Sequence, residues 1–341
     1  MNKLNMISVD LAKNIFQVGG FNSRNQVLFN KQLNRIKFIE FLSQQQPTLV
    51  VMEACYSSHY WGRVAESYGH RVKLLPAQHV TPFVRGNKSD RNDAIAIGEA
   101  ANRPNIQPVP IKSVEQQDIQ CLHRMRERYI RTQTGLINQT RGLLSEYGVI
   151  TPKGHKAFCE LLGVICEPEN KQISPLLKVQ FNQISEEYYQ LTGRVNELND
   201  QLKEVVGRNS LCKLLLSIPG IGVINATSIY SAIGNGSQFK NARQFAVWLG
   251  LTPKQASSGN KFTSGGISKR GNRYLRKQLV HGARAMLSRC KKKTDRISQW
   301  GNQLVVRRGF NKASVAMASR LARLCWVLLQ RNEPYKPVVD K

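Results

Sequence analysis

The stretch Lys88-Ser89-Asp90-Arg91-Asn92-Asp93 places two carboxylates three residues apart, at the start of the helix-forming run Ala94-Ile95-Ala96-Ile97-Gly98-Glu99. On a helix, that spacing puts both side chains on one face. Two acids so close repel each other unless a cation lies between them, and Mg²⁺ above all prefers such oxygen ligands. The alternative is that Asp90 and Asp93 simply stabilise the helix N-terminus, where acids favour the macrodipole.

Two further acids follow short apolar segments that are typical of β-strands. Asp10 ends the segment Met6-Ile7-Ser8-Val9, and Glu53 ends Leu49-Val50-Val51-Met52. In an open α/β sheet, side chains at the carboxyl ends of the strands gather in one crevice. We therefore expect these two acids to converge with Asp90 and Asp93. The chain has only 22 acidic residues against 50 basic ones, which favours a common site over helix capping alone.

The first 75 residues alternate in a way that predicts a mixed sheet with helices packed on its faces. The expected strands are residues 4–10, 15–20, 26–31, 49–53 and 71–75. The expected helices begin at Asn34 and Ser57. Prolines between residues 104 and 110 break the helix that follows the acidic pair, and they mark a domain boundary near residue 110.

The charge of the chain indicates what it binds. A net charge of +28 over 341 residues implies a polyanionic partner, and nucleic acid is the first candidate. The alternative is an anionic membrane surface, but no apolar run reaches the length of a membrane span and no signal peptide opens the chain, so we expect a cytoplasmic protein. Seven cysteines without a Cys-x-x-Cys pair fit neither a disulfide framework nor a zinc knuckle.

Two long helices are expected in the middle of the chain. Residues 113–147 and 176–206 are rich in helix-forming residues, and a loop rich in Gly and Pro, from Gly148 to about Pro175, separates them. Apolar residues in the second segment recur at intervals near three and four, which is typical of a coiled-coil seam. Such a pair serves as a spacer or dimerisation arm, or else as a helical hairpin packed on its own domain.

A tight turn, Ser217-Ile218-Pro219-Gly220-Ile221-Gly222, connects two apolar helical segments in the last third of the chain. A Pro-Gly-x-Gly turn at this position leaves backbone N–H groups exposed at a helix N-terminus, which suits a phosphate. The turn resembles the hairpin of helix-hairpin-helix modules, which hold the DNA backbone without reading its sequence. Gly220 and Gly222 are therefore candidate nucleic-acid contacts.

Basic residues concentrate after this turn. Residues 254–331 contain 19 Lys or Arg and a single acid, Asp295. Solvated charge runs usually balance their signs, so this excess favours contacts with phosphates. A small polar loop, residues 256–261, precedes a basic helix whose core face we expect at Leu275, Leu279, Ala283, Met286 and Leu287. The candidate basic contacts are Lys261, Lys269, Arg270, Arg273, Arg276 and Lys277.

Five motifs in this order resemble one family, the DEDD insertion-sequence transposases, a group that includes the Piv-type invertases and the bridge-RNA (seek-RNA) guided recombinases. The resemblance spans nearly the whole chain. Residues 53–61 look most like the branch whose elements carry subterminal inverted repeats. The motifs are Ser8–Lys13, Met52–Cys55, Asn87–Ala94, Ile218–Gly222, and Leu251-Thr252-Pro253 through Gly271-Asn272.

The resemblance implies three domains. Residues 1–110 would form an α/β RuvC-like (RNase H-like) domain, whose acids Asp10, Glu53, Asp90 and Asp93 hold Mg²⁺. Residues 111–207 would form a long-helix coiled-coil linker that serves oligomerisation. Residues 208–341 would form a mainly α transposase domain with a helix-hairpin-helix-like motif and a serine nucleophile. Alignment places that serine at Ser258, although the adjacent Ser257 leaves the choice open.

The resemblance also implies partners and a location. Donor DNA, target DNA and a structured non-coding guide RNA would bind to a homo-oligomer, a dimer or tetramer, in the bacterial cytosol or nucleoid. The acidic site of one subunit would meet the serine of another.

The chemistry is coherent without the family. A serine hydroxyl needs activation by a base or a metal, and no Ser-His-Asp set is legible, so Mg²⁺ on the acids would polarise the phosphate. Attack by serine would conserve the energy of the phosphodiester bond. Two alternatives stay open. A structure-selective nuclease would use water and would keep cleavage in Ser258→Ala, whereas a non-catalytic nucleic-acid scaffold would never break strands.

Overall fold

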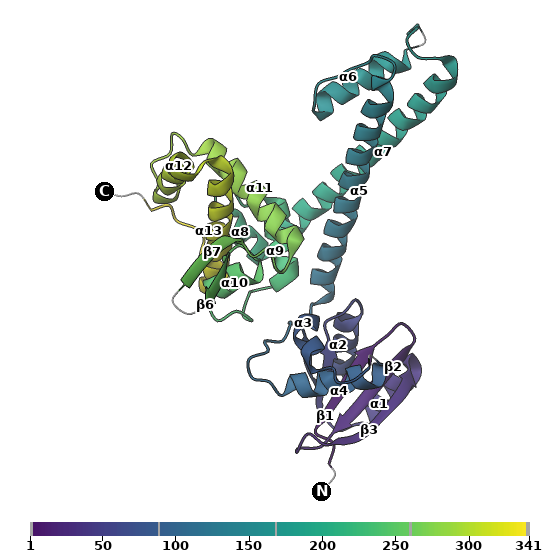
Figure 1. The fold of residues 1–341 in the computed structure, drawn as a ribbon, viewed down its shortest axis with the longest axis vertical. Coiled ribbons are helices and arrows are strands. Elements are labelled where there is room, and N and C mark those ends of the chain that lie inside the picture. Colours follow the sequence, from purple (N-terminus) through teal and green to yellow (C-terminus); the bar gives the residue numbers. More distant parts are fainter. Residues whose placement is uncertain (1–2, 88, 168, 259–260, 339–341) are drawn as a thin grey trace. The chain divides into compact units, whose positions relative to one another are not determined.

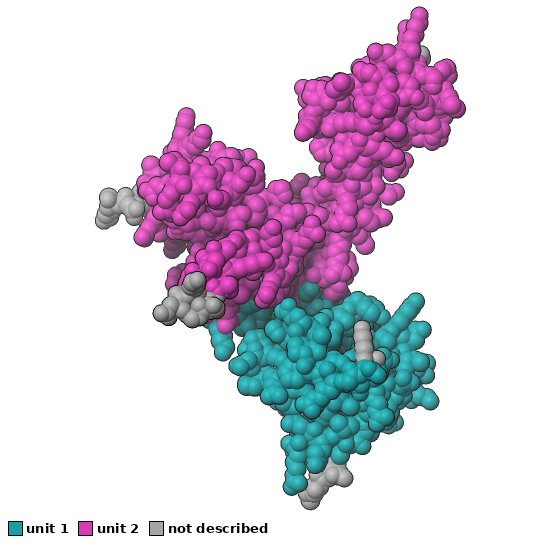
Figure 2. Space-filling model, in the orientation of Figure 1, with its two compact units in different colours: residues 1–114, 236–240 teal, residues 115–235, 241–341 magenta. Residues whose placement is uncertain are grey.

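The computed structural model describes residues 3–87, 89–167, 169–258 and 261–338. Lys88 of the acidic motif and Gly259-Asn260 of the expected polar loop lie outside the described residues, as do the side chains of Ser257, Ser258 and Lys261. The chain forms two compact units, coloured separately in Figure 2: unit 1 is residues 1–114 with 236–240, and unit 2 is residues 115–235 with 241–341.

Unit 1 is built on a five-stranded sheet with the order β3-β2-β1-β4-β5. The first three strands pair antiparallel, and β1, β4 and β5 run parallel. The mixed sheet expected from the sequence is confirmed. The strands are β1 (Met6–Leu11), β2 (Ile15–Phe21), β3 (Val27–Asn34), β4 (Leu49–Glu53) and β5 (Arg71–Leu75).

Helices cover both faces of this sheet (Figure 1). On one face, α1 (Arg35–Gln44) and α2 (Ser58–Ser67) bury Phe38 and Trp61 against alternate residues of β1, β2 and β4. On the other face, α4 (Asp90–Ala101) packs on Met6, Phe21 and other residues of these strands. The short α3 (Ala77–Val80) and η1 (Thr81–Phe83) connect β5 to this second layer.

Gly98 lets α4 approach the sheet closely. A Cβ at this position would lie 2.4 Å from the ring of Phe21, which is far inside van der Waals contact. Packing therefore explains a glycine inside this helix, where it otherwise lowers helix stability. The close approach holds the whole helix, including its acidic first turn, against the sheet.

The first part of unit 2 is a helical arm. Helices α5 (Val114–Ser145) and α7 (Pro175–Arg208) run side by side (Figure 1). They are antiparallel, because Gln133 bonds Thr192 at 2.7 Å while Arg126, earlier in α5, bonds Asn199, later in α7, at 2.6 Å. A helical pair is thus present, and its role in oligomerisation stays a prediction.

The loop expected between the two long helices is wrong in part, because it contains a third helix, α6 (His155–Cys166). Its apolar residues Phe158, Leu162 and Ile165 are buried against the end of the arm. They join Ile137, Leu144, Phe181 and Tyr188, among others, in a cluster drawn entirely from the arm. The turn-forming residues on both sides of α6 obscured its apolar face in the sequence.

The second part of unit 2 packs several helices around α13 (Phe310–Arg331), which is contacted by α8, α10, α11 and α12. The expected core face of α11 is confirmed, since Leu275, Leu279, Ala283, Met286 and Leu287 are all buried. The helices are α8 (Ser210–Leu216), α9 (Val223–Ile233), α10 (Ala242–Trp248), α11 (Arg273–Arg289) and α12 (Arg296–Arg308). No helix among the described residues is long and apolar enough to cross a membrane.

The polar loop expected at residues 256–261 is also wrong in part. Most of it belongs to a two-stranded antiparallel sheet, β6 (Pro253–Ser258) with β7 (Lys261–Ile267). Serine, lysine and glycine in these strands gave no apolar alternation, because the described side chains of the hairpin are almost all exposed rather than packed on one face.

Candidate active site and nucleic-acid interface

The strand-end acids lie next to each other in unit 1. Strands β1 and β4 are parallel neighbours with Val9 opposite Met52, and the next residue on each strand is Asp10 or Glu53. Side chains alternate across a strand. Because Val9 and Met52 are buried on the face of α1 and α2, both acids project from the opposite face, which α4 covers. Both are half-buried.

The N-terminus of α4 lies at the same end of the sheet. Gly98, late in the helix, packs on Phe21, which pairs with the start of β1 at Met6. At the start of the helix, the Arg91 carbonyl accepts a hydrogen bond from the Asn30 side chain at 3.0 Å. Asn30 lies on β3, and the pairing of β3 with β2 and of β2 with β1 places it level with the middle of β1. The helix therefore runs antiparallel to β1, so its first turn lies toward the carboxyl ends of β1 and β4.

Ser89, rather than an acid, caps this helix. Its hydroxyl accepts from the N–H of Asn92 at 3.3 Å, and Asp90 and Asp93 lie in the first turn. Asp90 is exposed and Asp93 is half-buried. Neither carboxylate is needed as the cap, although both still favour the helix dipole.

The acids are not arranged as a closed metal site. Among the described residues, which include all four acids, no group of three or more His, Cys, Asp or Glu side chains could hold a metal ion. Register and helix direction bring the acids to one end and one face of the sheet, but not into a common ligand sphere.

The candidate nucleophile lies in unit 2, at the end of a strand. Ser258 is the last residue of β6 and pairs with Lys261, the first residue of β7. The hairpin is anchored at its base, where the N–H of Ser268 donates to the Thr252 carbonyl at 2.8 Å. The backbone of Ser257 and Ser258 is thus carried at the tip of a two-stranded projection.

A basic groove runs along this hairpin. It encloses about 920 Å³ between β6, β7, α10 and α13. Among the described residues, four cations and four hydroxyl side chains line it, and no acid does. These side chains are Arg243, Lys254, Arg270 and Arg323, with Thr252, Thr263, Ser268 and Ser319. Arg243 and Arg323 were not singled out in the sequence, because only the fold brings α10 and α13 to the hairpin.

The other candidate contacts have different surroundings. Lys269, Arg270 and Arg273 are exposed. Arg276 instead donates to the carbonyl of Leu249 at 2.8 Å, and Lys277 donates to both carboxylate oxygens of Glu127 at 2.6 Å. These two cations stabilise the fold around α11.

The glycines of the turn also differ. Gly222 is exposed at the N-terminus of α9, whereas the backbone of Gly220, at a φ of +88°, packs on α11. The turn between two helices is present, and phosphate binding by it stays a prediction.

Sequence reasoning missed a buried histidine between α5, α9 and α11. His123 contacts Tyr274 through Nδ1 and Thr227 through Nε2, each at 3.0 Å. The Thr227 hydroxyl donates to the Val223 carbonyl at 2.7 Å, so its oxygen accepts from Nε2–H. Nδ1 then accepts from Tyr274, whose pKa is raised by burial to about 12. The partners are 104 and 151 residues away in sequence, so no local pattern reveals them.

This histidine should make the protein less stable in acid. Burial, helped by the charge of Arg126, lowers the pKa of His123 to about 4. Between pH 6.5 and pH 4, this histidine is protonated in the unfolded chain and neutral in the folded chain. The free energy of unfolding is therefore highest above pH 6.5 and decreases as the pH falls toward 4. We expect a loss of about 2–3 kcal/mol over this range. Calorimetry from pH 7.5 to 4.5 should show a weaker pH dependence in His123→Gln, and equal dependence in both proteins would contradict the assignment.

Comparison with known proteins decides the family. Residues 7–149 match a transposase profile of the DEDD IS110 type, and residues 212–299 match the profile of the IS116/IS110/IS902 transposase family. A probable family 20 transposase of Pseudomonas aeruginosa is 42% identical over 98% of this chain and 99% of its own length. The transposase of insertion element IS1111A from Coxiella burnetii is 40% identical over 98% of this chain and 92% of its own.

The chain belongs to the IS110 family of transposases. A pilin gene-inverting protein of Moraxella bovis is also similar, at 23% identity over 96% of this chain and 97% of its own length. In this IS110-family transposase, the first profile spans Asp10, Glu53, Asp90 and Asp93, and the second spans the Pro-Gly-x-Gly turn and the β6–β7 hairpin. Both candidate sites therefore lie in segments common to the family.

Proposed function

We propose that this transposase cuts and rejoins DNA through a covalent bond between a strand and Ser258, with a metal-dependent acidic site at Asp10, Glu53, Asp90 and Asp93. The observation that carries the proposal is the position of Asp10 and Glu53 on adjacent parallel strands, with the first turn of α4 at the same end of the sheet. The acids belong to unit 1 and the serine to unit 2, and in the proposed reaction both act on the same scissile phosphate.

The donor chemistry of the acidic site suits Mg²⁺. Mg²⁺ in proteins is often held by one or two carboxylates, with waters and substrate phosphates completing its octahedron. Asp10 and Glu53 supply such a pair, and a closed cage of protein ligands is not required. When bound, the ion would polarise the scissile phosphate. Asp90 and Asp93 would supply further oxygens from α4.

The hairpin and the basic groove support the role of Ser258. In the proposed reaction the hydroxyl oxygen forms a bond to phosphorus and the bond from phosphorus to the leaving strand's oxygen breaks. The hydroxyl proton passes through solvent water to that leaving oxygen, which becomes the free hydroxyl end of the strand. In the rejoining step, a free strand end attacks the phosphorus bonded to Ser258. A new phosphodiester bond forms, the bond between phosphorus and the serine oxygen breaks, and the serine hydroxyl is restored. Arg243, Lys254, Arg270 and Arg323 would neutralise the phosphates on either side of the cut.

We further propose that a structured guide RNA selects the DNA and that the transposase acts as a dimer or tetramer. The net charge of +28 is more than a single short DNA contact requires, which supports binding of both DNA and RNA by the same protein. The paired helices α5 and α7 offer a long surface for self-association.

The decisive experiment separates the protein-linked strand from free cut strands. Wild-type transposase is incubated with labelled donor and target DNA, its element's RNA and Mg²⁺, and the products are run on a denaturing gel. We expect a protein-linked band that disappears in Ser258→Ala, and that persists in Ser257→Ala, the matched control for an adjacent hydroxyl. Free nicked DNA that survives in Ser258→Ala would mean that water is the nucleophile. Loss of the band in Ser257→Ala alone would move the nucleophile by one residue.

A further inference from the structure

A second cavity in unit 2 has a different character from the basic groove. It encloses about 390 Å³ where α5 meets α9 and the start of α11. Among the described residues, it shares no lining residue with the basic groove along the hairpin. Its lining residues are Gln120, His123, Arg124, Glu127, Arg128, Arg131, Ser228, Ser231, Ala232, Asn272, Tyr274 and Leu275.

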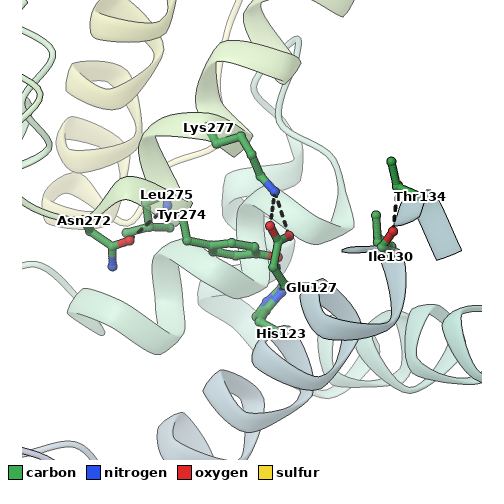
Figure 3. Close-up of polar contacts among 8 residues, drawn as sticks. All are labelled: His123, Glu127, Ile130, Thr134, Asn272, Tyr274, Leu275 and Lys277. Carbon is green, nitrogen blue, oxygen red and sulfur yellow. Dashed lines mark hydrogen bonds and ion pairs between the residues drawn. The ribbon is translucent and has the colours of Figure 1, made fainter. Parts of the chain in front are cut away.

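The inner wall of this cavity is polar and aromatic. Figure 3 shows the ring of Tyr274 between Asn272 and His123. The His123 imidazole fixes the tyrosine hydroxyl at 3.0 Å, so the ring is held in place before any ligand arrives. The buried hydroxyls of Ser228 and Ser231 donate to backbone carbonyls of α9, which leaves their oxygens as hydrogen-bond acceptors toward the cavity.

The rim of the cavity is cationic. Arg124, Arg128 and Arg131 are spaced four and three residues apart, so they lie on one face of α5, and all three are exposed. Arg128 stacks on the ring of Tyr129 at 4.6 Å. Within the part of the chain that the structure describes, no ion pair or hydrogen bond engages the guanidinium groups of Arg124 and Arg131.

The single carboxylate at the cavity does not oppose an anion there. Glu127 is already paired with Lys277, whose ammonium group donates to both carboxylate oxygens at 2.6 Å (Figure 3). The pair is partly buried, with 27% of the Glu127 side chain exposed. The net charge presented by the lining is therefore that of the three arginines.

We propose that this cavity is a nucleotide pocket, which takes one unpaired nucleotide of a bound nucleic-acid strand. The base enters beside Tyr274, the serine oxygens and the amides of Gln120 and Asn272 meet its polar edge, and the flanking phosphates lie on Arg124 and Arg131. The inference rests on the proposed function only in taking nucleic acid as the partner. It adds a site that reads pairing state rather than sequence.

The dimensions favour one nucleotide over a duplex. A volume of 390 Å³ is near the lower end of ligand pockets, about 300–1,000 Å³, and a double helix cannot enter it. Arginine is suited to phosphate through its planar fork, and aromatic rings accept any base by stacking. Recognition of this kind tolerates any base but requires it to be unstacked from its neighbours.

The test measures binding to matched oligonucleotides in EDTA, where no strand is cut. One duplex is fully paired, and the other carries a single unpaired 2-aminopurine, as DNA in one arm and as RNA in another. We expect the full-length transposase to bind the unpaired form about tenfold more tightly, with a change in 2-aminopurine fluorescence. Equal affinity for the two forms in both arms would overturn the proposal.

Two variants probe the pocket itself. Ala232→Leu fills the cavity from α9 and should remove the preference without changing affinity for the paired duplex. If Ala232→Leu lowers the unfolding temperature, a second variant, Gln120→Leu, tests the same point. It removes the amide group but keeps a side chain of similar volume, and it should also reduce the preference for the unpaired form. A preference that survives these changes would mean that the base does not enter here.

The rim is tested by charge. Arg124→Ala with Arg131→Ala should weaken binding of both duplexes and reduce the salt slope by about 1.8. The matched control is Lys156→Ala with Arg208→Ala, which removes two exposed cations that pair with neighbouring acids on α6 and α7. An equal effect of both double variants would mean that only general charge is sensed. Ser258→Ala should bind like wild type, so failure of the serine mechanism and failure of the pocket are separate outcomes.

Discussion

Asp10→Asn should reduce DNA strand cleavage by about a thousandfold or more and leave nucleic-acid affinity within about twofold. Asparagine has the shape of aspartate, so the half-buried position between β4 and the antiparallel partner Gln17 should be retained. It lacks the negative charge that would hold a hard cation beside Glu53. The measurement is the rate of appearance of cut strands at saturating Mg²⁺, with DNA and RNA affinities measured separately.

Asp118→Asn is the matched control for this change. Asp118 is an exposed acid near the start of α5, outside the sheet, and the same loss of one charge there should leave the rate unchanged. Glu53→Gln should reduce cleavage as Asp10→Asn does, because the two acids directly follow the paired residues Val9 and Met52 and so lie side by side on β1 and β4. Full activity in either acid variant would place the catalytic acids elsewhere and leave Asp90 and Asp93 with a role in helix stability only.

Gly282→Ala should destabilise unit 2 by about 2–4 kcal/mol. A Cβ at position 282 would lie 2.1 Å from the carbonyl oxygen of Gly220 and 2.6 Å from the amide nitrogen of Asn225. Gly220 cannot easily yield, because its φ of +88° is a conformation that other residues rarely adopt, and its carbonyl accepts from Asn225. The Pro-Gly-x-Gly turn would have to move away from α11. Urea unfolding followed by far-UV circular dichroism measures the loss.

Gly193→Ala is the corresponding control. Gly193 lies in α7, and no atom lies within 4 Å of an added Cβ among the described residues. Alanine is favoured over glycine in a helix by up to about 1 kcal/mol, so this variant should be slightly more stable than wild type. If Gly282→Ala behaved like Gly193→Ala, the close packing of the turn on α11 would be refuted.

The sheet of unit 1 was predictable because its strands obey local rules. Met6–Leu11 and Leu49–Glu53 are apolar runs that end in an acid, and the predicted and observed bounds differ by at most three residues in every strand. The helix start at Asp90 was predictable too, since the acids at spacing three precede an alanine-rich run. What the pattern did not reveal was that Ser89 is the cap and that the acids do not form a closed group.

The elements missed in unit 2 depend on contacts across the fold. Residues 148–175 carry turn signals at both ends, so the apolar face of α6 became visible only when packed against Phe181 and Tyr188. The described side chains of the β6–β7 hairpin form no buried face that could produce an alternating pattern. The cavity at His123 joins three helices that are far apart in sequence. Periodicity within one element carries no information about any of these.

The buried cluster at the end of the arm has a consequence for local unfolding of the molecule. As far as the chain is described, this cluster draws on residues 136–188 alone, and the helices around α13 contribute nothing to it. A buried core formed by one continuous segment can unfold while the rest of the protein stays folded. Amide hydrogens in this segment should therefore exchange together, with an opening free energy different from that of the helices around α13. The same independence means that a change in the length or sequence of the end of the arm should leave the packing of the helices that carry the basic groove intact.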